Sequence, residues 1–304
     1  MRPSPPTLPG CALACALACG SLALGCGAAA PPPSRIPDAK SAVERLDATF
    51  ASVSGVQGTA KIDYLGSAGR VRGDLMVLAS APSSLRFAIT ASVIGGAGEV
   101  ASDGVRFEAE DKGAGKYLVG PAKPCNIARI TQVPLPSDEL VPMLWGMRPK
   151  LAGPIACDSL DWSGAGYYTV MVRDGRPGSI AHELHLAPTP DDWQKPWAQQ
   201  RMRLLGVLGW SGDSLVYQVT MKDHQVAHTA KTDVADDPGL DEDTPPSGPN
   251  VDVELPRTIH VEVPSKKADV IFQYADAVVN PPLRAGVFTL KLAPGVPVEN
   301  AQCE

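Results

Sequence analysis

Strict alternation of apolar and polar residues over residues 56–110 restricts the possible folds of this chain more than any other feature. Side chains of a β-strand point alternately to its two faces, so a period of two residues predicts strands with one apolar and one polar face. Asp103-Gly104 joins two such segments, and this dipeptide is typical of a tight hairpin turn. The pattern predicts an antiparallel sheet that is covered on one face and wet on the other. The alternating segments are residues 56–64, 71–77, 85–93 and 105–109.

Two short helices are expected among the strands. Ser41 and Glu44 have the spacing of a capping box, in which the two side chains satisfy free backbone N–H groups at the start of a helix. Apolar residues follow at helical spacing, which predicts an amphipathic helix. Residues 137–146 predict a second helix, apolar over most of its circumference, which therefore has to be covered. Further strands are expected at residues 167–172, 180–186, 201–208, 215–221, 251–263, 269–276 and 287–292.

The predicted sheet has more apolar surface than two short helices can bury. A sheet with one apolar face normally packs on its helices. A long antiparallel sheet also twists and curls, however, and an apolar hollow beneath the helices would suit acyl chains. The residues expected to line this hollow are Val71, Leu75, Val77, Leu85, Phe87, Ile89, Phe107, Phe272 and Tyr274.

The first 25 residues have the pattern of an export signal. Arg2 supplies a positive charge, and residues 11–25 are apolar or small throughout. This run is shorter than the ~20 residues that a helix needs to span a bilayer, so a retained transmembrane anchor is disfavoured. The run ends at Gly25-Cys26, and the segment LALGC resembles a bacterial lipobox, in which the cysteine is lipidated and becomes the first mature residue. The alternative is an ordinary signal peptide cut near residues 28–30, which leaves no lipid.

The rest of the chain reads as a tether followed by one domain. Three consecutive prolines make residues 26–37 an extended, semi-rigid tether, and the domain occupies residues 38–304. Within it, residues 233–250 are rich in acidic residues and prolines, which predicts a mobile surface insertion. The formal net charge of −6 argues against nucleic acid as a partner, because binding there depends on neutralising phosphates.

Four cysteines lie outside the predicted signal peptide: Cys26, Cys125, Cys157 and Cys303. An exported protein enters an oxidising compartment, where disulfides are permitted. If Cys26 is acylated, three thiols remain and at least one is left over. The pair Cys125–Cys157 is preferred because it would close a loop around an apolar segment, although the sequence does not decide the pairing.

Patterns for catalysis or metal binding are sparse. His182 and His185 lie three residues apart in a predicted strand, which places them on opposite faces, and their spacing is one residue short of the helical zinc motif HExxH. The acidic residues of 233–250 lack the spacing of a calcium loop. The sequence also lacks a glycine-rich phosphate loop and a G-x-S-x-G nucleophile turn. We therefore expect no enzyme activity, no metal site and no cofactor.

The order of these parts resembles the LolA/LolB-like lipoprotein family. The segment PSSLR at residues 82–86 is similar to a Pro-x-x-Leu-Arg element that follows the first strands of that family. Residues 140–149 resemble its leucine-rich helix ending in Gly-x-x-Pro, and residues 255–259 and 269–274 fit its last part. The likeness covers most of residues 38–298. It implies a mainly β fold with a minor α part: a many-stranded antiparallel barrel, not closed, wrapped around short helices.

The resemblance also implies a function. The chain is expected to be a lipoprotein of the cell envelope, anchored through Cys26 in the outer membrane and facing the periplasm. Its ligand would be a lipid or acylated protein, bound in an apolar cavity during transfer to that membrane. The alternatives are an envelope assembly protein with a filled barrel and an unidentified protein partner, and, less favoured, a periplasmic hydrolase. Trp193 and Trp197 are expected to cap a core, the alternative being a place at a membrane or partner surface.

Overall fold

The computed structural model describes residues 28–67, 69–92, 98–131, 135–151, 153–176, 178–230 and 244–303. The first half of the chain forms helix α1, a run of strands and two further helices. These elements are α1 (Ala39–Phe50), β1 (Gly55–Gly66), β2 (Gly69–Ser80), β3 (Ser84–Ser92), β4 (Glu99–Ser102), β5 (Arg106–Asp111), β6 (Lys116–Pro121), α2 (Pro124–Thr131) and α3 (Ser137–Met143).

The second half is mostly strands, with three short 3₁₀ turns. Its elements are β7 (Ile155–Ser163), β8 (Tyr167–Asp174), β9 (Ala181–Pro188), η1 (Pro190–Asp192), η2 (Trp197–Gln199), β10 (Met202–Ser211), β11 (Ser214–Lys222), β12 (Gln225–His228), β13 (Asp252–Leu255), β14 (Thr258–Val263), η3 (Pro264–Lys266), β15 (Ala268–Val279) and β16 (Val298–Asn300). None of the helices in the described part of the chain has the length and apolar character to cross a bilayer.

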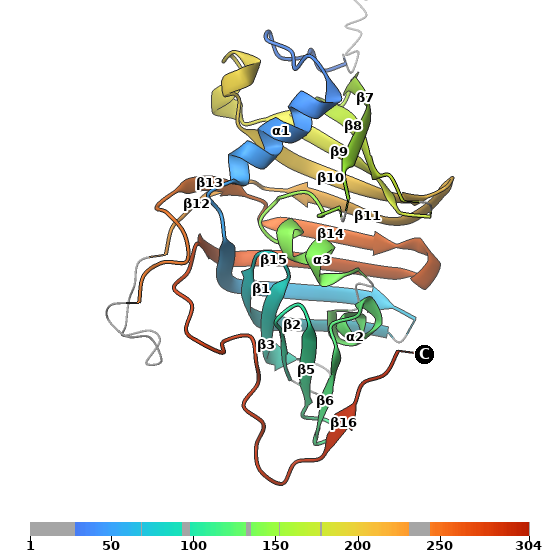
Figure 1. The fold of residues 1–304 in the computed structure, drawn as a ribbon, viewed down its shortest axis with the longest axis vertical. Coiled ribbons are helices and arrows are strands. Elements are labelled where there is room, and N and C mark those ends of the chain that lie inside the picture. Colours follow the sequence, from blue (N-terminus) through green and yellow to red (C-terminus); the bar gives the residue numbers. More distant parts are fainter. Residues whose placement is uncertain are drawn as a thin grey trace, which may run out of the picture.

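Within the described residues, fourteen strands form one sheet in the order β16-β6-β5-β4-β3-β2-β1-β15-β14-β11-β10-β9-β8-β7. Neighbouring strands are antiparallel, except that β16 runs parallel to β6. Strand β1 pairs with both β2 and β15, so it joins the two halves of the sheet. The sheet curves around the helices and stays unclosed, with β7 and β16 at its edges (Figure 1). The predicted fold class is therefore confirmed.

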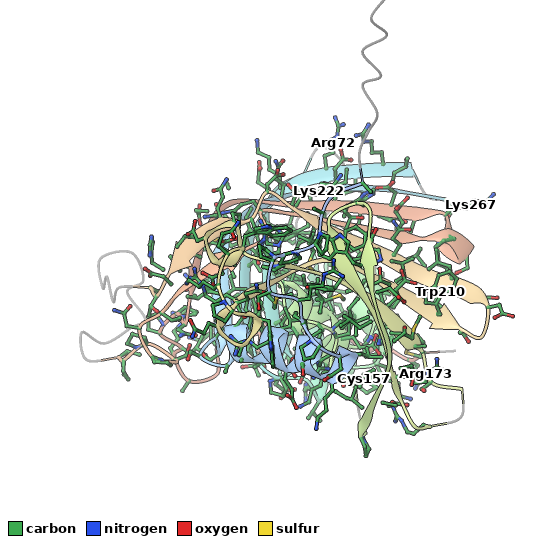
Figure 2. All side chains as sticks on the ribbon, turned by 90° about the horizontal axis from the view of Figure 1, so that it is seen from above. Arg72, Cys157, Arg173, Trp210, Lys222 and Lys267 are labelled. Carbon is green, nitrogen blue, oxygen red and sulfur yellow. A yellow bond between two sulfur atoms is a disulfide. The ribbon has the colours of Figure 1, made fainter. Side chains whose placement is uncertain are left out.

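The alternation seen in the sequence separates the two faces of this sheet. Val56, Ala60 and Tyr64 of β1 are buried on the inner face. On the outer face, the Asp63 carboxylate of the same strand accepts bonds from Arg70 and Arg72 of β2, whose guanidinium groups lower the pKa of Asp63 to about 2. Figure 2 shows Arg72 at the outer side of the sheet. A period of two residues thus puts Val56, Ala60 and Tyr64 on the helix side, whereas Leu65 near the end of the strand is 53% exposed.

Helix α1 starts earlier than the capping box predicts. Asp38 is its N-cap residue, and its carboxylate accepts a bond of 2.7 Å from the backbone N–H of Ser41. Asp38 precedes the helix by one residue and has extended backbone geometry, so it reaches the free N–H groups of the first turn. The predicted amphipathic face is correct, because Val43 and Leu46 are buried and α1 packs against β7, β8 and β10.

Other expected elements need correction. Helix α2 was not predicted, although Pro124 suits the first position of a helix. The segment expected as one strand at residues 251–263 is two strands, β13 and β14, separated by Pro256-Arg257. Proline lacks the N–H group that a continuous ladder requires at this point. Residues 287–292, expected as a strand, form turns and irregular chain.

The expected disulfide Cys125–Cys157 is wrong. Cys125 is bonded to Cys303, and Cys157 is a free, half-buried thiol. The sheet order explains the difference, because Cys157 lies on edge strand β7, whereas Cys125 follows β6 near the opposite edge. The chain returns to that edge at its end, where the Ala301 N–H group donates to the Val119 carbonyl and the Asn126 amide donates to the Ala301 carbonyl.

The described part of the predicted tether packs against the domain. The Ala29 N–H group donates to the Gly164 carbonyl in the β7–β8 turn, and Ile36 is buried with its N–H group 3.3 Å from the Tyr168 hydroxyl. Cys26 lies outside the described residues. So do residues 233–243 of the predicted acidic insertion, whereas its end, from Thr244 on, passes beside Pro282.

Asn280 connects the end of β15 to two neighbouring segments. Its side-chain oxygen accepts bonds from the Ser54 N–H and hydroxyl groups at 2.7 and 3.0 Å. Its amide nitrogen donates to the carbonyls of Ser52 and Pro249, each at 2.8 Å. The residue is fully buried and has a φ of 51°. Asparagine adopts this left-handed geometry more readily than most residues.

Replacing Asn280 by alanine should lower the free energy of unfolding by about 2 kcal/mol, because buried backbone groups lose their partners. Urea unfolding followed by circular dichroism would measure the change. Asn250→Ala is the matched control, since Asn250 is exposed and should change the stability by less than about 0.5 kcal/mol. Equal midpoints for Asn280→Ala and the parent protein would contradict the structural role of this side chain.

Candidate functional site

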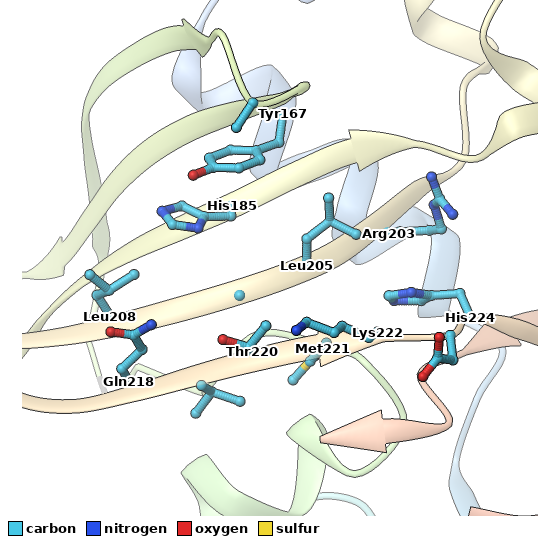
Figure 3. Close-up of a pocket in the computed structure, with 14 residues that line it drawn as sticks. Tyr167, His185, Arg203, Leu205, Leu208, Gln218, Thr220, Met221, Lys222 and His224 are labelled. Atoms are coloured by element: carbon cyan, nitrogen blue, oxygen red, sulfur yellow. The ribbon is translucent and has the colours of Figure 1, made fainter. Parts of the chain in front are cut away.

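The outer face of β9 to β11 carries an open groove of about 700 Å³ (Figure 3). Two of its polar side chains have partners within the protein: the His185 ring lies 2.9 Å from Glu183, and the Arg203 guanidinium donates to the Pro188 carbonyl at 3.3 Å. The His224 ring contacts the Leu204 carbonyl, and burial lowers the pKa of His224 to about 4, so this ring is neutral at neutral pH. The remaining polar lining residues, among them Gln218 and Lys222, line an open surface, so this groove does not by itself indicate a ligand.

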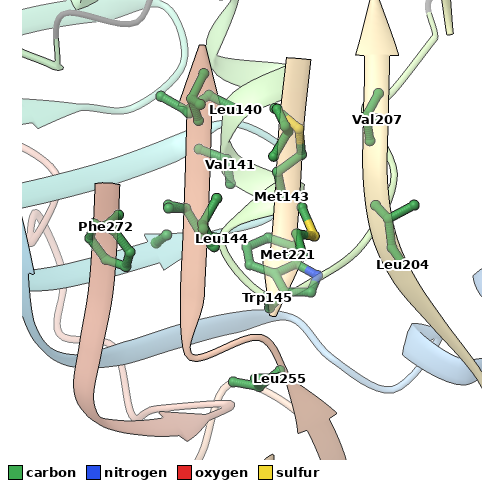
Figure 4. Close-up of a cluster of buried hydrophobic side chains, with 14 of the residues drawn as sticks. Leu140, Val141, Met143, Leu144, Trp145, Leu204, Val207, Met221, Leu255 and Phe272 are labelled. Carbon is green, nitrogen blue, oxygen red and sulfur yellow. The ribbon is translucent and has the colours of Figure 1, made fainter. Parts of the chain in front are cut away.

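The inner face is covered by α3 and the turn that follows it. Leu140, Val141, Leu144 and Trp145 are all buried, and the Trp145 side chain is only 1% exposed. Figure 4 shows these side chains between Phe272 on one side and the strand of Val207 on the other. Seven residues are too few for a stable helix on their own, so α3 depends on this packing.

A small apolar cavity lies between α3 and the sheet, with a volume of about 80 Å³. The register of three strands builds its floor, because Phe272 of β15 lies opposite Ile62 of β1 on one side and Ile259 of β14 on the other. Leu140 and Leu144 of α3 close it from above. The other lining residues are Leu75, Phe87, Ile89, Val261 and Val270.

Four of the nine residues expected to line a hollow lie around this cavity: Leu75, Phe87, Ile89 and Phe272. Val77, Leu85, Phe107 and Tyr274 are buried in the core but do not line the cavity. Val71 is 40% exposed, so its expected place in the lining is wrong. It lies opposite Tyr64 next to the β1–β2 turn.

The lining residues that were not predicted from the sequence lie in α3 and the turn after it, and in β1, β14 and β15. The alternation of β1 puts Ile62 on the inner face, but no local signal shows which strand pairs with β1. Its partner β15 is about two hundred residues away in the chain. Strand pairs of this separation are set by the whole fold, not by neighbouring residues.

Polar contacts tie α3 to the sheet at both ends. At its start, the Glu139 carboxylate lies 3.5 Å from the Tyr217 hydroxyl of β11 and 3.7 Å from the His182 ring of β9. Burial, and then the charge of Glu139, raise the pKa of Tyr217 well above its usual range, so its hydroxyl stays protonated and can donate. After the end of α3, the Tyr274 hydroxyl of β15 donates to the Leu144 carbonyl at 3.1 Å. The helix is therefore held by a few identifiable contacts.

The predicted opposite placement of two histidines is confirmed. His182 is buried on the inner face, whereas His185 stacks on Tyr167 on the outer face, with ring centroids 4.3 Å apart. Neither histidine lies beside a set of metal ligands. In the described residues, the side chains of His260, Glu262 and Asp269 do meet, with ligand atoms within 4.8 Å of one another.

The strand ladder accounts for the meeting of these three side chains. The His260 ring and the Asp269 carboxylate form a contact of 2.9 Å. Glu262 lies opposite Asp269 in the ladder between β14 and β15, which brings the second carboxylate close. The expectation of no metal, no cofactor and no enzyme activity stays a prediction.

Comparison with known proteins identifies the fold. No protein-family model matches the sequence, and neither does any curated protein. A domain from Vibrio parahaemolyticus named for outer membrane lipoprotein sorting has a similar structure, with a TM-score of 0.50 and 10% identity over 83% of this chain and 97% of that one. A LolA superfamily protein from Nitrosomonas europaea gives a TM-score of 0.50 and 13% identity, over 84% of this chain and 99% of the other.

The predicted resemblance to the LolA/LolB-like family is confirmed as a likeness of fold. Both similar structures are matched over almost their whole length, so the likeness concerns the entire unclosed barrel and not a single motif. Identities of 10% and 13% carry the fold alone. What this chain binds has to be argued from its own cavity.

Proposed function

We propose that this protein is a lipid-anchored protein of the cell envelope that binds an acyl chain between α3 and the sheet. The anchor is Cys26, which holds the domain at the outer membrane on its periplasmic side. The acyl chain belongs to a lipid or to a lipidated protein in transit to that membrane. The names of the two similar structures, lipoprotein sorting and LolA superfamily, support a role in transport.

The observation that carries this proposal is the cavity lined only by apolar side chains, with α3 as its cover. Pockets that bind small molecules are mostly apolar and lie where elements of a fold meet, which is the position of this cavity. Acyl chains have no polar groups along their length, so a lining without donors or acceptors suits them.

The cavity has to enlarge before it can hold a ligand. Its volume of about 80 Å³ is well below the ~300–1,000 Å³ of typical ligand pockets. The sheet is continuous and hydrogen-bonded, whereas α3 is a short helix held by side-chain contacts. Displacement of α3 from the sheet is therefore the low-energy way to make room.

Replacing Ile89 by tryptophan should abolish acyl binding by filling the cavity, with at least a tenfold loss of affinity, or about 1.4 kcal/mol. Ile89 is half-buried at the cavity, so the larger ring can be accommodated without unfolding the core. The measurement is uptake of a fluorescent fatty acid by the purified mature protein, with mass spectrometry of co-purified lipid.

Met76→Trp is the matched control, because Met76 lies on the neighbouring strand β2 and is 51% exposed on the outer face. It should bind the fatty acid as the parent does. Unchanged uptake by Ile89→Trp would place the ligand elsewhere and overturn the proposed site.

The small cavity also favours a second candidate, an envelope assembly protein with a filled barrel. Trp145, Tyr217 and Phe107 are among the largest fully buried side chains and occupy much of the interior. In that case the parent protein would carry no lipid and would take up no fatty acid at any concentration tested. The same uptake experiment therefore separates the two candidates.

A further inference from the structure

Residues 28–36 are hydrogen-bonded to one end of the unclosed barrel. The Trp162 indole N–H of β7 donates to the Ala29 carbonyl at 2.8 Å, and the Ala29 N–H group donates to the Gly164 carbonyl of the β7–β8 turn at 2.9 Å. Gly164 leaves room for this approach, because a Cβ atom there would lie 3.2 Å from the Ala28 Cβ atom. Ala28 and Ala29, the first residues that the structure describes, therefore lie against the β7–β8 turn.

Three tryptophans gather at the same end. The rings of Trp162 and Trp193 meet edge to face, with centroids 5.9 Å apart. Trp197 begins η2, and its backbone N–H group donates to the Ser34 hydroxyl at 2.9 Å. All three side chains are half-buried, and those of Trp162 and Trp197 pack against the core. Figure 1 shows the segment from Ala28 on, the end of the β7–β8 hairpin and the chain of η1 and η2 in the upper part of the molecule.

We propose that this end, residues 28–36, 160–167 and 188–201, is a docking surface for a phospholipid bilayer, with the three tryptophans at the level of the lipid headgroups. The proposal rests on the lipid anchor at Cys26 that forms part of the proposed function. Two peptide links separate Cys26 from Ala28, and they span at most about 7 Å. Acyl chains attached at Cys26 would therefore enter the bilayer beside the β7–β8 turn and bring this end against the membrane.

Tryptophan suits that position because its ring is apolar while its N–H group is polar, and it is enriched at membrane interfaces for this reason. The sequence alone leaves open whether Trp193 and Trp197 cap a core or lie at a membrane or partner surface. Trp197 packs against the core, as expected, whereas Trp193 packs on the ring of Trp162, whose indole N–H group bonds to the chain that leads to Cys26.

The charges of this surface fit a zwitterionic membrane. The three segments carry equal numbers of acidic and basic side chains, and the buried Asp192 binds both Lys195 and Arg201, at 2.6 and 2.8 Å. These basic groups lower the pKa of Asp192, so it stays ionised. A surface with balanced charge gains little from anionic lipids, whose attraction acts on clusters of Lys and Arg. Docking should therefore not depend on anionic lipid.

The test attaches the mature chain to vesicles and measures quenching of its tryptophans by brominated phosphatidylcholine. The chain starts at Cys26 and carries Cys157→Ser, so that a maleimide lipid reacts at Cys26 alone. This coupling makes the test independent of acylation in the cell, which mass spectrometry of the exported protein decides separately. Quenching should approach the share of emission from three of the five tryptophans, whatever the content of anionic lipid. Emission equal to that with unbrominated lipid would overturn the proposal.

A second readout leaves the tryptophans in place. In one variant, a polarity-sensitive fluorescent amino acid replaces Ala165 in the β7–β8 turn, so that Cys26 stays the only thiol that the maleimide lipid can reach. In the other, the same fluorescent amino acid replaces Asp213 in the β10–β11 turn, which lies with the β8–β9 turn at the opposite end of these strands. On vesicles, the emission of the first should shift to shorter wavelength and that of the second should not. Equal shifts, or none, would show that the tethered domain has no fixed face toward the membrane.

Discussion

Replacing Cys125 and Cys303 together by serine should lower the free energy of unfolding by about 4–5 kcal/mol. The two cysteines are 178 residues apart, so their bond closes most of the mature chain into one loop. A crosslink restricts the unfolded chain more as this loop lengthens, which is why a large loss is expected. Urea unfolding of the parent and of the double variant, both monitored by circular dichroism, would measure it.

The loss should also be visible locally. Strand β16 pairs with β6 at three positions and is the edge strand of the sheet that the described residues form, so without the disulfide it is weakly held. The Ala301 N–H group, which donates to the Val119 carbonyl at 2.7 Å, should exchange its hydrogen faster in the variant. The amide hydrogens of inner strands such as β1 exchange through global unfolding. Their exchange should therefore become faster only as far as the lower global stability requires.

Cys157→Ser is the control for the disulfide variant. Cys157 is unpaired and burial raises the pKa of its thiol, so the serine variant should retain the stability of the parent within about 1 kcal/mol. A peptide map that shows Cys125 joined to Cys157, or equal unfolding midpoints for the double variant and the parent, would contradict the pairing seen in the structure.

The disulfide illustrates where sequence reasoning stops. Alternation within residues 56–110 correctly predicts strands with buried faces, because the two-residue period is a local property of a strand. The partner of a cysteine, in contrast, depends on which strand forms each edge of the sheet. The pairing of Cys125 with Cys157 is expected from the sequence because it would close a loop around an apolar segment, but the order of strands in the sheet separates the two residues.

The same limit applies to the cavity. Leu75 and Phe87 could be assigned to an apolar face from their own strands, and they do line the cavity. Ile259 could not, because it reaches the cavity through the pairing of β14 with β15 and of β15 with β1. Val71 has the same alternation as Leu75 but lies beyond the cover of α3. Periodicity predicts which side chains share one face of a strand. Which part of that face is covered depends on the packed fold.

Loosening α3 should increase the affinity for acyl chains, although it lowers the stability of the protein. The Glu139→Ala and Tyr274→Phe substitutions together remove the polar contacts at both ends of the helix. Each such contact contributes about 1 kcal/mol, so the closed arrangement loses about 2 kcal/mol relative to the open one. If a ligand enters only the open arrangement, its apparent affinity rises with the open population, here by about 30-fold.

Tyr117→Phe is the matched control for this double variant. Tyr117 is also buried and lies on β6, next to the edge strand β16, where its hydroxyl accepts a bond of 3.2 Å from the Ala293 N–H group. Its loss should reduce the unfolding free energy without changing acyl affinity. Fatty-acid titration alongside urea unfolding would report both quantities. Weaker binding by the Glu139→Ala/Tyr274→Phe variant, in step with its lower stability, would show that α3 is a fixed part of the core and not a cover that moves.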